Sequence, residues 1–291
     1  MLDSIARLRR FNRVVTREIG ALDTSYLGRG RPLAAARVLH LIRSEGTDLA
    51  DLRRRLGLDT GLLSRILRGL EREGLVETSP DPADRRRRIA TLTERGRAEW
   101  AVYDALGRAK AEAVFARAGP RRDEVIAAMD LIATVMLRDE VRIADADPDD
   151  PANLHCTGEY FRLLAARVPG VTPEMLVLPL PDAARCRAPE GATLIAWSDD
   201  LPVGTVALRR HDATSAEVKR LWIDPLARGQ GLGRRMMRAI EARARDMGFT
   251  WARLDSNTAL AEAIALYRSD GWRETGPYSG PPADIWMIKR L

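Results

Sequence analysis

The sequence predicts two domains, a helical amino-terminal domain followed by an α/β domain with a mixed sheet. Apolar residues recur three or four positions apart through most of residues 1–144, which is the pattern of amphipathic helices. In residues 155–291, alternating apolar segments are interspersed with helical ones, as in a sheet covered by helices. The expected strands include residues 176–180 and the last segment, 285–291, which we expect at the edge of the sheet. Residues 145–154 between them are acidic, contain two prolines and lack periodicity, so we expect a solvated, semi-stiff connector there.

The charge of the chain is unevenly divided between these halves. Residues 1–144 contain 28 basic and 21 acidic side chains, a balance of +7, whereas residues 145–291 contain 19 and 20, a balance of −1. A basic excess confined to one half favours a polyanionic partner there, such as double-stranded DNA. The alternative is a general preference for arginine, since lysine occurs only at positions 110, 219 and 289. That preference does not explain the asymmetry.

Several classes of protein are disfavoured by the composition. A length of 291 residues suffices for two buried cores, and no run of about 18 apolar residues is present, so we expect no contact with a membrane. The first residues lack the apolar core of a signal peptide, so we expect a cytoplasmic protein. Cys156 and Cys186 are too few for a disulfide framework, and the three histidines are widely separated, so no metal site is expected.

A glycine-rich turn in the second half carries the first chemical signal. Residues 217–223 alternate like a strand and end at Asp224-Pro225. The segment Arg228-Gly-Gln-Gly-Leu-Gly233 follows, and residues 234–247 have helical spacing. Glycines let the backbone adopt positive φ and approach a ligand, while the start of a helix favours a phosphate group. Many such turns bind nothing, and no acidic partner for a ribose follows at the spacing of a dinucleotide fold.

Two motifs in the same order resemble the GNAT-type N-acetyltransferases. Arg-Gly-x-Gly-x-Gly after a strand ending in Asp-Pro is similar to the acetyl-CoA loop of that family. The stretch from Asn257 through Tyr267 to Gly271-Trp272 is similar to its second motif. The resemblance covers about residues 155–291. It implies a GNAT (acyl-CoA N-acyltransferase) fold, acetyl-CoA as the cofactor, and transfer of the acetyl group to a primary amine of a small molecule or a protein.

The resemblance also implies roles for particular residues. The end of the strand, Leu221, Trp222 and Ile223, would hold the pantetheine and acetyl groups, and Asn257 would hold the cofactor arm. The pyrophosphate would be bound by the loop residues Arg228, Gly229, Gln230, Gly231, Leu232 and Gly233. Tyr267 would contact the cofactor and act as the general acid that protonates the departing thiolate. Glu217 would accept the proton of the amine. The alternatives are that Tyr267 is only a packing residue and that Glu217 is a surface carboxylate.

In the first half, two short helices form a helix-turn-helix pattern. Asp48 is a predicted N-cap of residues 49–56, and Gly57 ends that helix. Asp59 is predicted to cap a second helix, which buries leucines and directs Ser64, Arg65 and Arg68 outward. Such a second helix lies in the major groove of DNA. The alternative is a small helical bundle with a solvated basic face.

A predicted hairpin after the second helix favours the DNA-binding interpretation. Residues 73–78 are extended, a turn ends at Asp84, and Arg85, Arg86, Arg87 and Arg88 lead into a second extended segment. The order Leu70-Glu71-x-x-Gly74-Leu75-Val76, Asp84-Arg85-Arg86 and Leu92-Thr93-x-x-Gly96 resembles the MarR family of transcription regulators, over about residues 1–140. The resemblance implies a winged helix-turn-helix in which Thr60, Ser64, Arg65 and Arg68 face DNA, Asp84 orients Arg86 or its neighbours, and the wing arginines reach phosphates or the minor groove.

The resemblance further implies a homodimer, formed by the first helix together with two amphipathic helices at 97–117 and 123–142. The alternative is that these helices close a monomeric core.

Two functions from different classes then remain. The protein is either a DNA-binding regulator that also acetylates an amine, or a regulator whose second domain only senses acetyl-CoA. The glycine-rich loop, Asn257 and Tyr267 favour the enzyme, because a sensor would not need Tyr267.

Overall fold

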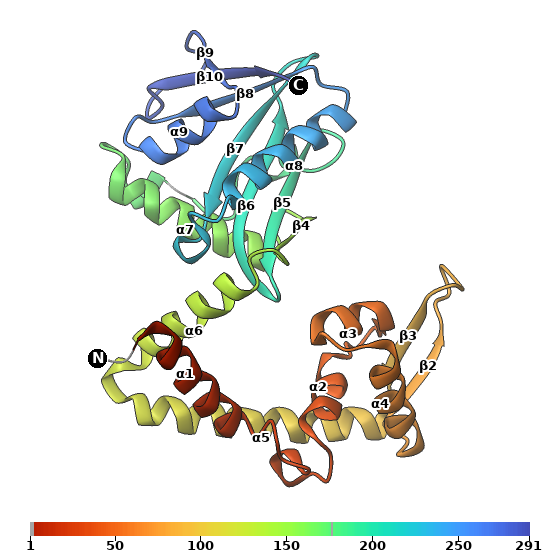
Figure 1. The fold of residues 1–291 in the computed structure, drawn as a ribbon. Coiled ribbons are helices and arrows are strands. Elements are labelled where there is room, and N and C mark those ends of the chain that lie inside the picture. Colours follow the sequence, from red (N-terminus) through yellow and green to blue (C-terminus); the bar gives the residue numbers. More distant parts are fainter. Residues whose placement is uncertain (1–2, 176) are drawn as a thin grey trace. The chain divides into compact units, whose positions relative to one another are not determined.

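A computed structural model describes residues 3–175 and 177–291 of the chain. The chain divides into two compact units, Met1–Val125 and Ile126–Leu291. The first unit consists mainly of helices and the second contains a large sheet (Figure 1). The division falls inside the helix α6 (Arg122–Met136). No helix among the described residues is long and apolar enough to cross a membrane.

The first unit is built from helices, and side-chain caps fix where most of them start. Its helices are α1 (Ser4–Ile19), α2 (Leu33–Leu41), α3 (Leu49–Leu56), α4 (Thr60–Arg72) and α5 (Glu94–Ala118). Side-chain caps fix the starts of all of these except α2. Asp48 accepts from the amides of Ala50 and Asp51, and Asp59 accepts from that of Leu62, so both predicted N-caps are confirmed. A core of α2, α3 and α4 side chains, including Leu39, Leu52 and Leu70, fixes the angle of the helix pair.

A three-stranded antiparallel sheet forms the predicted hairpin. Strands β1 (Thr47–Asp48), β2 (Val76–Pro80) and β3 (Arg88–Leu92) pair in the order β1-β3-β2. The base of the hairpin lies tightly against α5, since a Cβ at Gly96 would meet the carbonyl oxygen of Leu75 at 1.9 Å. Only glycine fits there, which explains why the motif places glycine three residues after Thr93, the N-cap of α5.

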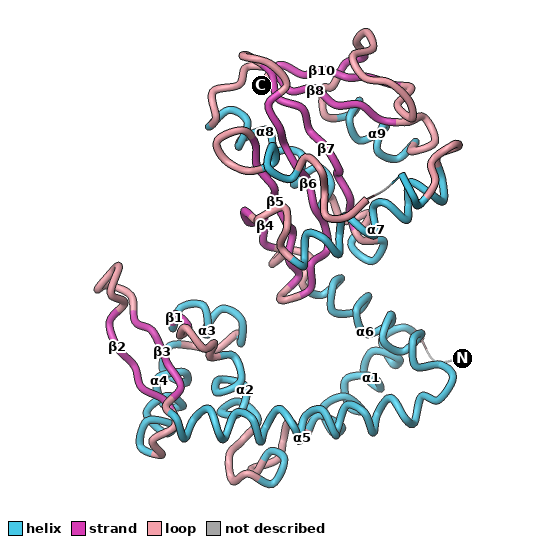
Figure 2. Tube along the Cα trace, turned by 180° about the vertical axis from the view of Figure 1, so that it is seen from behind, coloured by secondary structure: helices cyan, strands magenta, loops and turns pink. Residues whose placement is uncertain are grey.

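The second unit contains a seven-stranded mixed sheet, as the sequence predicted (Figure 2). Its strands are β4 (Arg142–Asp145), β5 (Gly191–Ser198), β6 (Leu201–Arg210), β7 (Ser215–Ile223), β8 (Trp251–Ser256), β9 (Arg273–Glu274) and β10 (Ile285–Arg290). The order is β4-β5-β6-β7-β8-β10-β9. Strands β7 and β8 are parallel and the other pairings are antiparallel. A parallel pair needs a crossover, and α8 (Leu232–Asp246) provides it.

Helices cover both faces of this sheet. Figures 1 and 2 show α8 on one face and α7 (Pro151–Arg167) on the other. Side chains of α8, including Met236, Met237 and Ile240, form the main core with alternate residues of the strands. On the opposite face, the Thr205 hydroxyl of β6 donates to Asn153 Oδ1 of α7 at 2.7 Å. The helix α9 (Ala261–Ser269) contributes Ile264 to the same core as α8.

A β-bulge interrupts the middle of the sheet. Thr205 is opposite Trp222 and Ala207 is opposite Lys219, so two residues of β7, Arg220 and Leu221, face one residue of β6. Arg220 has a φ of 56°, in the left-handed region that a side chain rarely adopts. Because one extra residue reverses the alternation, Ala216 and Val218 contact the α8 core before the bulge, but Leu221 and Ile223 contact it afterwards. The bulge therefore redirects the end of β7.

Three expectations need correction. The connector predicted at residues 145–154 begins in β4, which pairs with β5, and ends in α7, whose N-cap is Asp150. Its acidic side chains bind arginines of the same unit, so its low hydrophobicity reflects ion pairs at a sheet edge. Of the strand expected at 176–180, Leu176 lies outside the described residues, and residues 177–180 are not a strand.

The last strand, β10, was expected at an edge of the sheet, but it pairs with both β8 and β9 and is therefore an inner strand.

Candidate functional site

The glycine-rich turn opens the start of α8 to a ligand. Asp224 closes the end of β7 by accepting from the amide of Leu226 at 2.8 Å. Gly229 and Gly231 then have φ of 73° and 80°, a conformation that favours glycine. Gly231 is the N-cap of α8, and no side chain of the described residues caps the helix. The first amides of α8 therefore point toward the turn without a side-chain acceptor, which suits an anionic ligand.

A pocket of about 440 Å³ adjoins this turn. Eight of the residues predicted to bind the cofactor lie in its wall: Leu221, Trp222, Ile223, Arg228, Gly229, Gly231, Leu232 and Gly233. The rest of the wall comes from α7, α9 and their neighbours: Tyr160, Leu163, Arg167, Ala227, Arg234, Leu260, Glu262, Ala263 and Leu266. The apolar part of the wall suits a pantetheine-like chain, and Arg228 and Arg234 beside the glycines suit a diphosphate.

Three predicted cofactor residues are not among the described residues that line this pocket. Gln230 donates to the carbonyl oxygen of Leu226, within the turn itself. Asn257 donates to the carbonyl oxygen of Pro282 at 2.6 Å and accepts from the amide of Ala259. Its amide therefore holds the segment at 275–284 against the end of β8. Tyr267 is 7% exposed and packs against Trp272, with ring centroids 6.2 Å apart.

Two tyrosines nevertheless lie close to the pocket. Burial and, to a smaller extent, nearby Asp255 raise the pKa of Tyr160 to about 12, while Arg220 opposes the shift. Burial also raises the pKa of Tyr267, and Tyr160 and Asp255 add to that shift. Both hydroxyls are therefore protonated at neutral pH and close enough to influence each other. Sequence reasoning identified Tyr267 but missed Tyr160, which belongs to the pocket wall.

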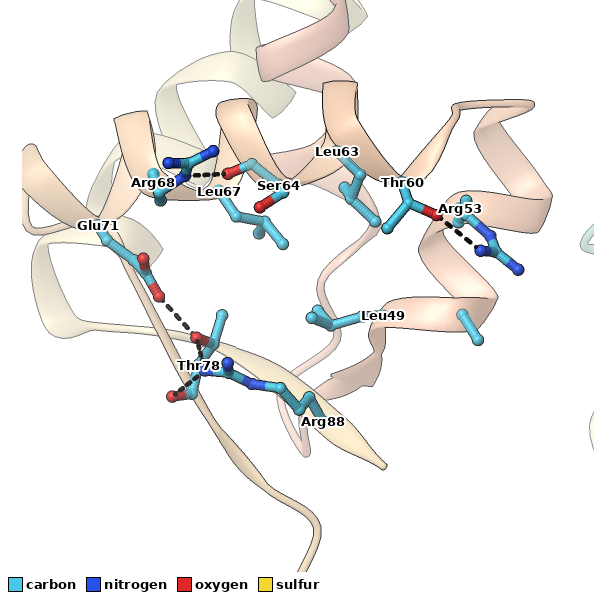
Figure 3. Close-up of a pocket in the computed structure, with 11 residues that line it drawn as sticks. Leu49, Arg53, Thr60, Leu63, Ser64, Leu67, Arg68, Glu71, Thr78 and Arg88 are labelled. Atoms are coloured by element: carbon cyan, nitrogen blue, oxygen red, sulfur yellow. Dashed lines mark hydrogen bonds between the residues drawn. The ribbon is translucent and has the colours of Figure 1, made fainter. Parts of the chain in front are cut away.

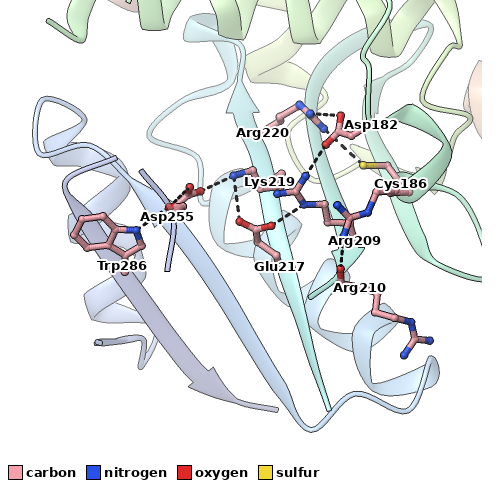
Figure 4. Close-up of polar contacts among 11 residues, drawn as sticks. Asp182, Cys186, Arg209, Arg210, Glu217, Lys219, Arg220, Asp255 and Trp286 are labelled. Carbon is pink, nitrogen blue, oxygen red and sulfur yellow. Dashed lines mark hydrogen bonds and ion pairs between the residues drawn. The ribbon is translucent and has the colours of Figure 1, made fainter. Parts of the chain in front are cut away.

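A network of buried charges surrounds Glu217 (Figure 4). Glu217 is 3% exposed, so it is not a surface carboxylate. It accepts from Arg209 Nε at 2.6 Å and from Lys219 Nζ at 3.2 Å. Lys219 also donates to Asp255 Oδ1 at 2.6 Å, and Asp182 binds both Arg209 and Arg220. Burial alone would raise the pKa of Asp255, but Lys219 and the hydroxyl of Ser279 hold it below its usual value.

In the first unit, a hollow of about 580 Å³ separates α4 from the hairpin (Figure 3). Thr60, Ser64 and Arg68 lie along its α4 side, and Thr78 and Arg88 lie on the hairpin side. All three α4 side chains are exposed, as is Arg65, which lies outside the hollow. Thr60 accepts from Arg53 of α3 at 2.9 Å. The outward face of the second helix is therefore polar and basic, as predicted.

The four hairpin arginines have different surroundings. Asp84 accepts from Arg86 through both carboxylate oxygens at 3.0 Å, which is the contact that the predicted orienting role requires. Arg87 donates to Asp48 at 2.8 Å and so ties the hairpin to the N-cap of α3. Arg88 donates to the Thr78 hydroxyl on the neighbouring strand. Arg85 is exposed and has no ion pair or hydrogen bond within the described chain, so its positive charge at the hairpin tip has no counter-charge there.

Comparison with known proteins matches each unit to a family. A model described as "Acetyltransferase (GNAT) domain" matches residues 189–274, and one described as "MarR family" matches residues 29–87. An IAA acetyltransferase from Azospirillum brasilense is 32% identical over 155 residues, which are 52% of this chain and 98% of that protein. The chain belongs to the GNAT acetyltransferase family. It is an N-acetyltransferase that also carries a MarR family domain.

Other similar proteins match over a shorter segment or at lower identity. Human N-acetyltransferase 8B is 33% identical over 87 residues, which are 28% of this chain and 38% of that protein. A solved structure of a putative acyl-CoA N-acyltransferase from Klebsiella pneumoniae is 28% identical and has a TM-score of 0.42, covering 52% of this chain and 97% of that one. The PaiA N-acetyltransferase of Thermoplasma acidophilum, solved with coenzyme A, is 16% identical with a TM-score of 0.44 and covers 52% and 99%.

The part of the GNAT site that the motifs do not contain comes from α7. Tyr160 and Arg167 of this helix enter the pocket wall, and Arg167 pairs with Glu262 of α9 at 2.9 Å. The only signal in the sequence was a helical pattern of apolar and aromatic residues at 152–169, where the GNAT resemblance begins. Helical spacing identifies a buried face but does not show which residue of that face borders a ligand.

Proposed function

We propose that the protein is a bifunctional homodimer, which binds double-stranded DNA through its MarR domain and transfers acetyl from acetyl-CoA to a primary amine through its GNAT domain. One observation carries the enzymatic half. Gly229 and Gly231 adopt left-handed backbone at the uncapped start of α8, and the pocket beside them extends to the bulged end of β7. A diphosphate fits the end of the pocket at the glycines, and the acyl-bearing chain attached to it fits the end at β7.

The chain supplies binding and proton transfer, while the thioester supplies the activated acetyl group. Amides at the start of α8, together with Arg228 and Arg234, would hold the diphosphate. The bulge leaves an extra residue of β7 outside the ladder, so the backbone near Leu221 can donate to a carbonyl oxygen in the pocket. Such a donor stabilises the negative charge that develops when an amine attacks.

We assign the proton for the departing thiolate to Tyr267, whose pKa is also raised by Tyr160 in the pocket wall. A raised pKa keeps each hydroxyl protonated until it is needed. Glu217 is the proposed acceptor of the amine proton. Because Arg209 and Lys219 already occupy its oxygens, the amine or a bridging water must replace one of these partners. This exchange makes Glu217 a base only when an acceptor is bound.

The DNA-binding half rests on the exposed face of α4 and on the hairpin. Thr60, Ser64, Arg65 and Arg68 would contact bases or phosphates in the major groove, while Arg85 and its neighbours reach the backbone or the minor groove. Dimerisation is supported by α1, none of whose described side chains is buried although Ile5, Leu8, Phe11 and Val14 are apolar. An amphipathic helix with an uncovered apolar face needs a partner surface.

Two measurements test the proposal. Calorimetry of the full-length protein with coenzyme A should show saturable binding, and a panel of primary amines should show acetyl-CoA-dependent release of thiol. Binding without turnover of any amine would instead favour the acetyl-CoA sensor. For the MarR domain, binding to duplex DNA should weaken as the salt concentration rises. Arg65→Gln should reduce the slope of log K against log salt concentration by about one, because one phosphate contact is lost. No heat with coenzyme A would contradict the enzymatic half alone.

A further inference from the structure

Two neighbouring polar groups beside the charge network lack a partner. Among the described residues, three buried side-chain polar atoms have no hydrogen bond, and two of them are Arg253 Nε and Tyr278 Oη. The two side chains contact each other, because the Arg253 guanidinium lies 5.7 Å from the centroid of the Tyr278 ring. Buried polar groups are normally satisfied, so two unsatisfied donors in one place suggest a ligand that accepts hydrogen bonds.

The charged side chains around these groups carry one more positive charge than negative charge. Arg209, Lys219 and Arg220 alternate with three carboxylates, Asp182, Glu217 and Asp255, and each of these charges has an opposite partner. Arg253 adds a fourth positive charge on the same face of the sheet, and it has no ion pair with any described residue. A part-buried charge without a counter-charge is unfavourable, so an anion would stabilise this position.

This position lies on the same sheet as the cofactor pocket, because Arg253 is opposite Glu217, and Leu221, four residues further along β7, lines the pocket. Pairing between β7 and β8 ends at Glu217 and Arg253, so the two strands separate beyond this point toward Leu221. Tyr160 borders the pocket, and its pKa responds to Asp255 and Arg220, which belong to the network. An amine that attacks an acyl group near Leu221 would therefore extend its remaining atoms over the network.

We propose that the acceptor amine carries a carboxylate, which binds the guanidinium of Arg253 with the Tyr278 hydroxyl as a second donor. This inference rests on the proposed acetyl transfer. Arg253 Nε and Tyr278 Oη are both enclosed, but each side chain as a whole is part exposed. A carboxylate can therefore reach the outer nitrogens of Arg253 directly, and the Tyr278 side chain must turn for its hydroxyl to donate as well. Arg253 is level with Glu217, four residues before Leu221, or about 13 Å along the strand. Part of this distance is covered by the arginine side chain, so several bonds should separate the amine from the carboxylate.

The test compares amines that differ only in the carboxylate. Glycine, β-alanine, γ-aminobutyrate and ε-aminocaproate are assayed with acetyl-CoA beside their carboxamides. The carboxylate form of the longer acceptors should have a kcat/KM about tenfold to a hundredfold higher, mainly through a lower KM, as expected for a charge-assisted hydrogen bond. Equal rates for acids and amides, or a preference for amides, would overturn the proposal.

Substitutions locate the effect. Arg253→Gln should abolish the preference for the acid, whereas Arg238→Gln, which removes an arginine with a 70% exposed side chain on α8, should retain it. Tyr278→Phe removes one hydroxyl and should reduce the preference without abolishing it, which provides a second reading if Arg253→Gln fails to fold. A preference that survives both changes would contradict the site. If the unaltered protein does not bind coenzyme A, the proposed function is contradicted instead.

Discussion

Single side chains decide how protons and charges are placed in this protein. Tyr267 was identified from the GNAT motif, but its ring packs in the core, while Tyr160 of α7 lies in the pocket wall. Glu217 is in the predicted strand but shares its oxygens with Arg209 and Lys219. Residue type and order thus identify which groups are present, and their neighbours decide what each group can do.

The two tyrosines give the first prediction. If Tyr267 donates the proton to the thiolate, Tyr267→Phe should lower kcat about a hundredfold, because general acid catalysis contributes at least that much. Tyr160→Phe should act mainly on KM. Steady-state kinetics with one accepted amine at several pH values measures both. If Tyr160→Phe has the larger effect on kcat, the proton comes from Tyr160 instead.

Asp48 gives a prediction about pH. Its carboxylate caps α3 and binds Arg87, and the hydrogen bond from Arg87 holds its pKa below the ordinary value of 3.8. Stability from this pair is complete above the unfolded pKa and is lost as the pH falls through the lower folded pKa. Asp48→Asn keeps a cap but removes the charge, so its destabilisation should be present at pH 7 and should vanish once the pH falls below the lowered pKa of the folded state.

Asp48→Ala is the companion variant. It removes the cap as well, so it should cost about 1 kcal/mol more than Asp48→Asn at every pH at which α3 is folded. Urea unfolding at pH 7 and at low pH measures both variants. A difference between Asp48→Asn and the unaltered protein that stays constant with pH would show that the ion pair with Arg87 contributes nothing.

At the scale of elements, the glycine turn and the bulge create the pocket together. The turn opens the start of α8, and the bulge in β7 reverses the alternation so that Leu221 and Ile223 face the α8 side. The turn was readable from its glycines. The bulge was not, because no residue type in Lys219-Arg220-Leu221 requires it, and it appears only in the register with β6.

Gly231 gives a prediction with a matched control at the other end of α8. Gly231 and Gly248 both have left-handed backbone, and a Cβ at either would meet no atom within 4 Å. Alanine should therefore cost each position about 1–2 kcal/mol of backbone strain. Only Gly231→Ala should also weaken coenzyme A, by about tenfold, because only this methyl group enters the pocket. Thermal unfolding and calorimetry separate the effects, and equal coenzyme A affinity in both variants would contradict the assigned site.

At the scale of the whole molecule, the exposed apolar face of α1 predicts a dimer. Leu8 and Phe11 are 47% and 39% exposed in the single chain. Replacing both by Asp should raise the dimer dissociation constant at least about a hundredfold, because charges would be buried in the interface. Light scattering after size exclusion measures the mass, and Leu201→Asp on the β5–β6 turn is the control. A monomeric unaltered protein would contradict the predicted homodimer.

Most of the fold was predictable because its signals are local. The caps at Asp48 and Asp59, the hairpin with four arginines and the glycine-rich turn depend on residues close together in the sequence, and each was confirmed as an element. The acidic segment at 145–154 was misread, because low hydrophobicity has the same appearance in a connector and in an edge strand. Only the pairing of β4 with β5 distinguishes them.

The sequence alone determined that one chain combines a winged helix-turn-helix with an acetyltransferase, because each motif encodes its own backbone conformation. The tertiary structure decided which side chains share a site. It brought Tyr160 of α7 to the wall that Leu221 and Gly231 form, and it left Arg253 without the counter-charge that every other member of its network has. Such neighbours are distant in sequence, and their contacts depend on strand register and helix packing, which residue types do not specify.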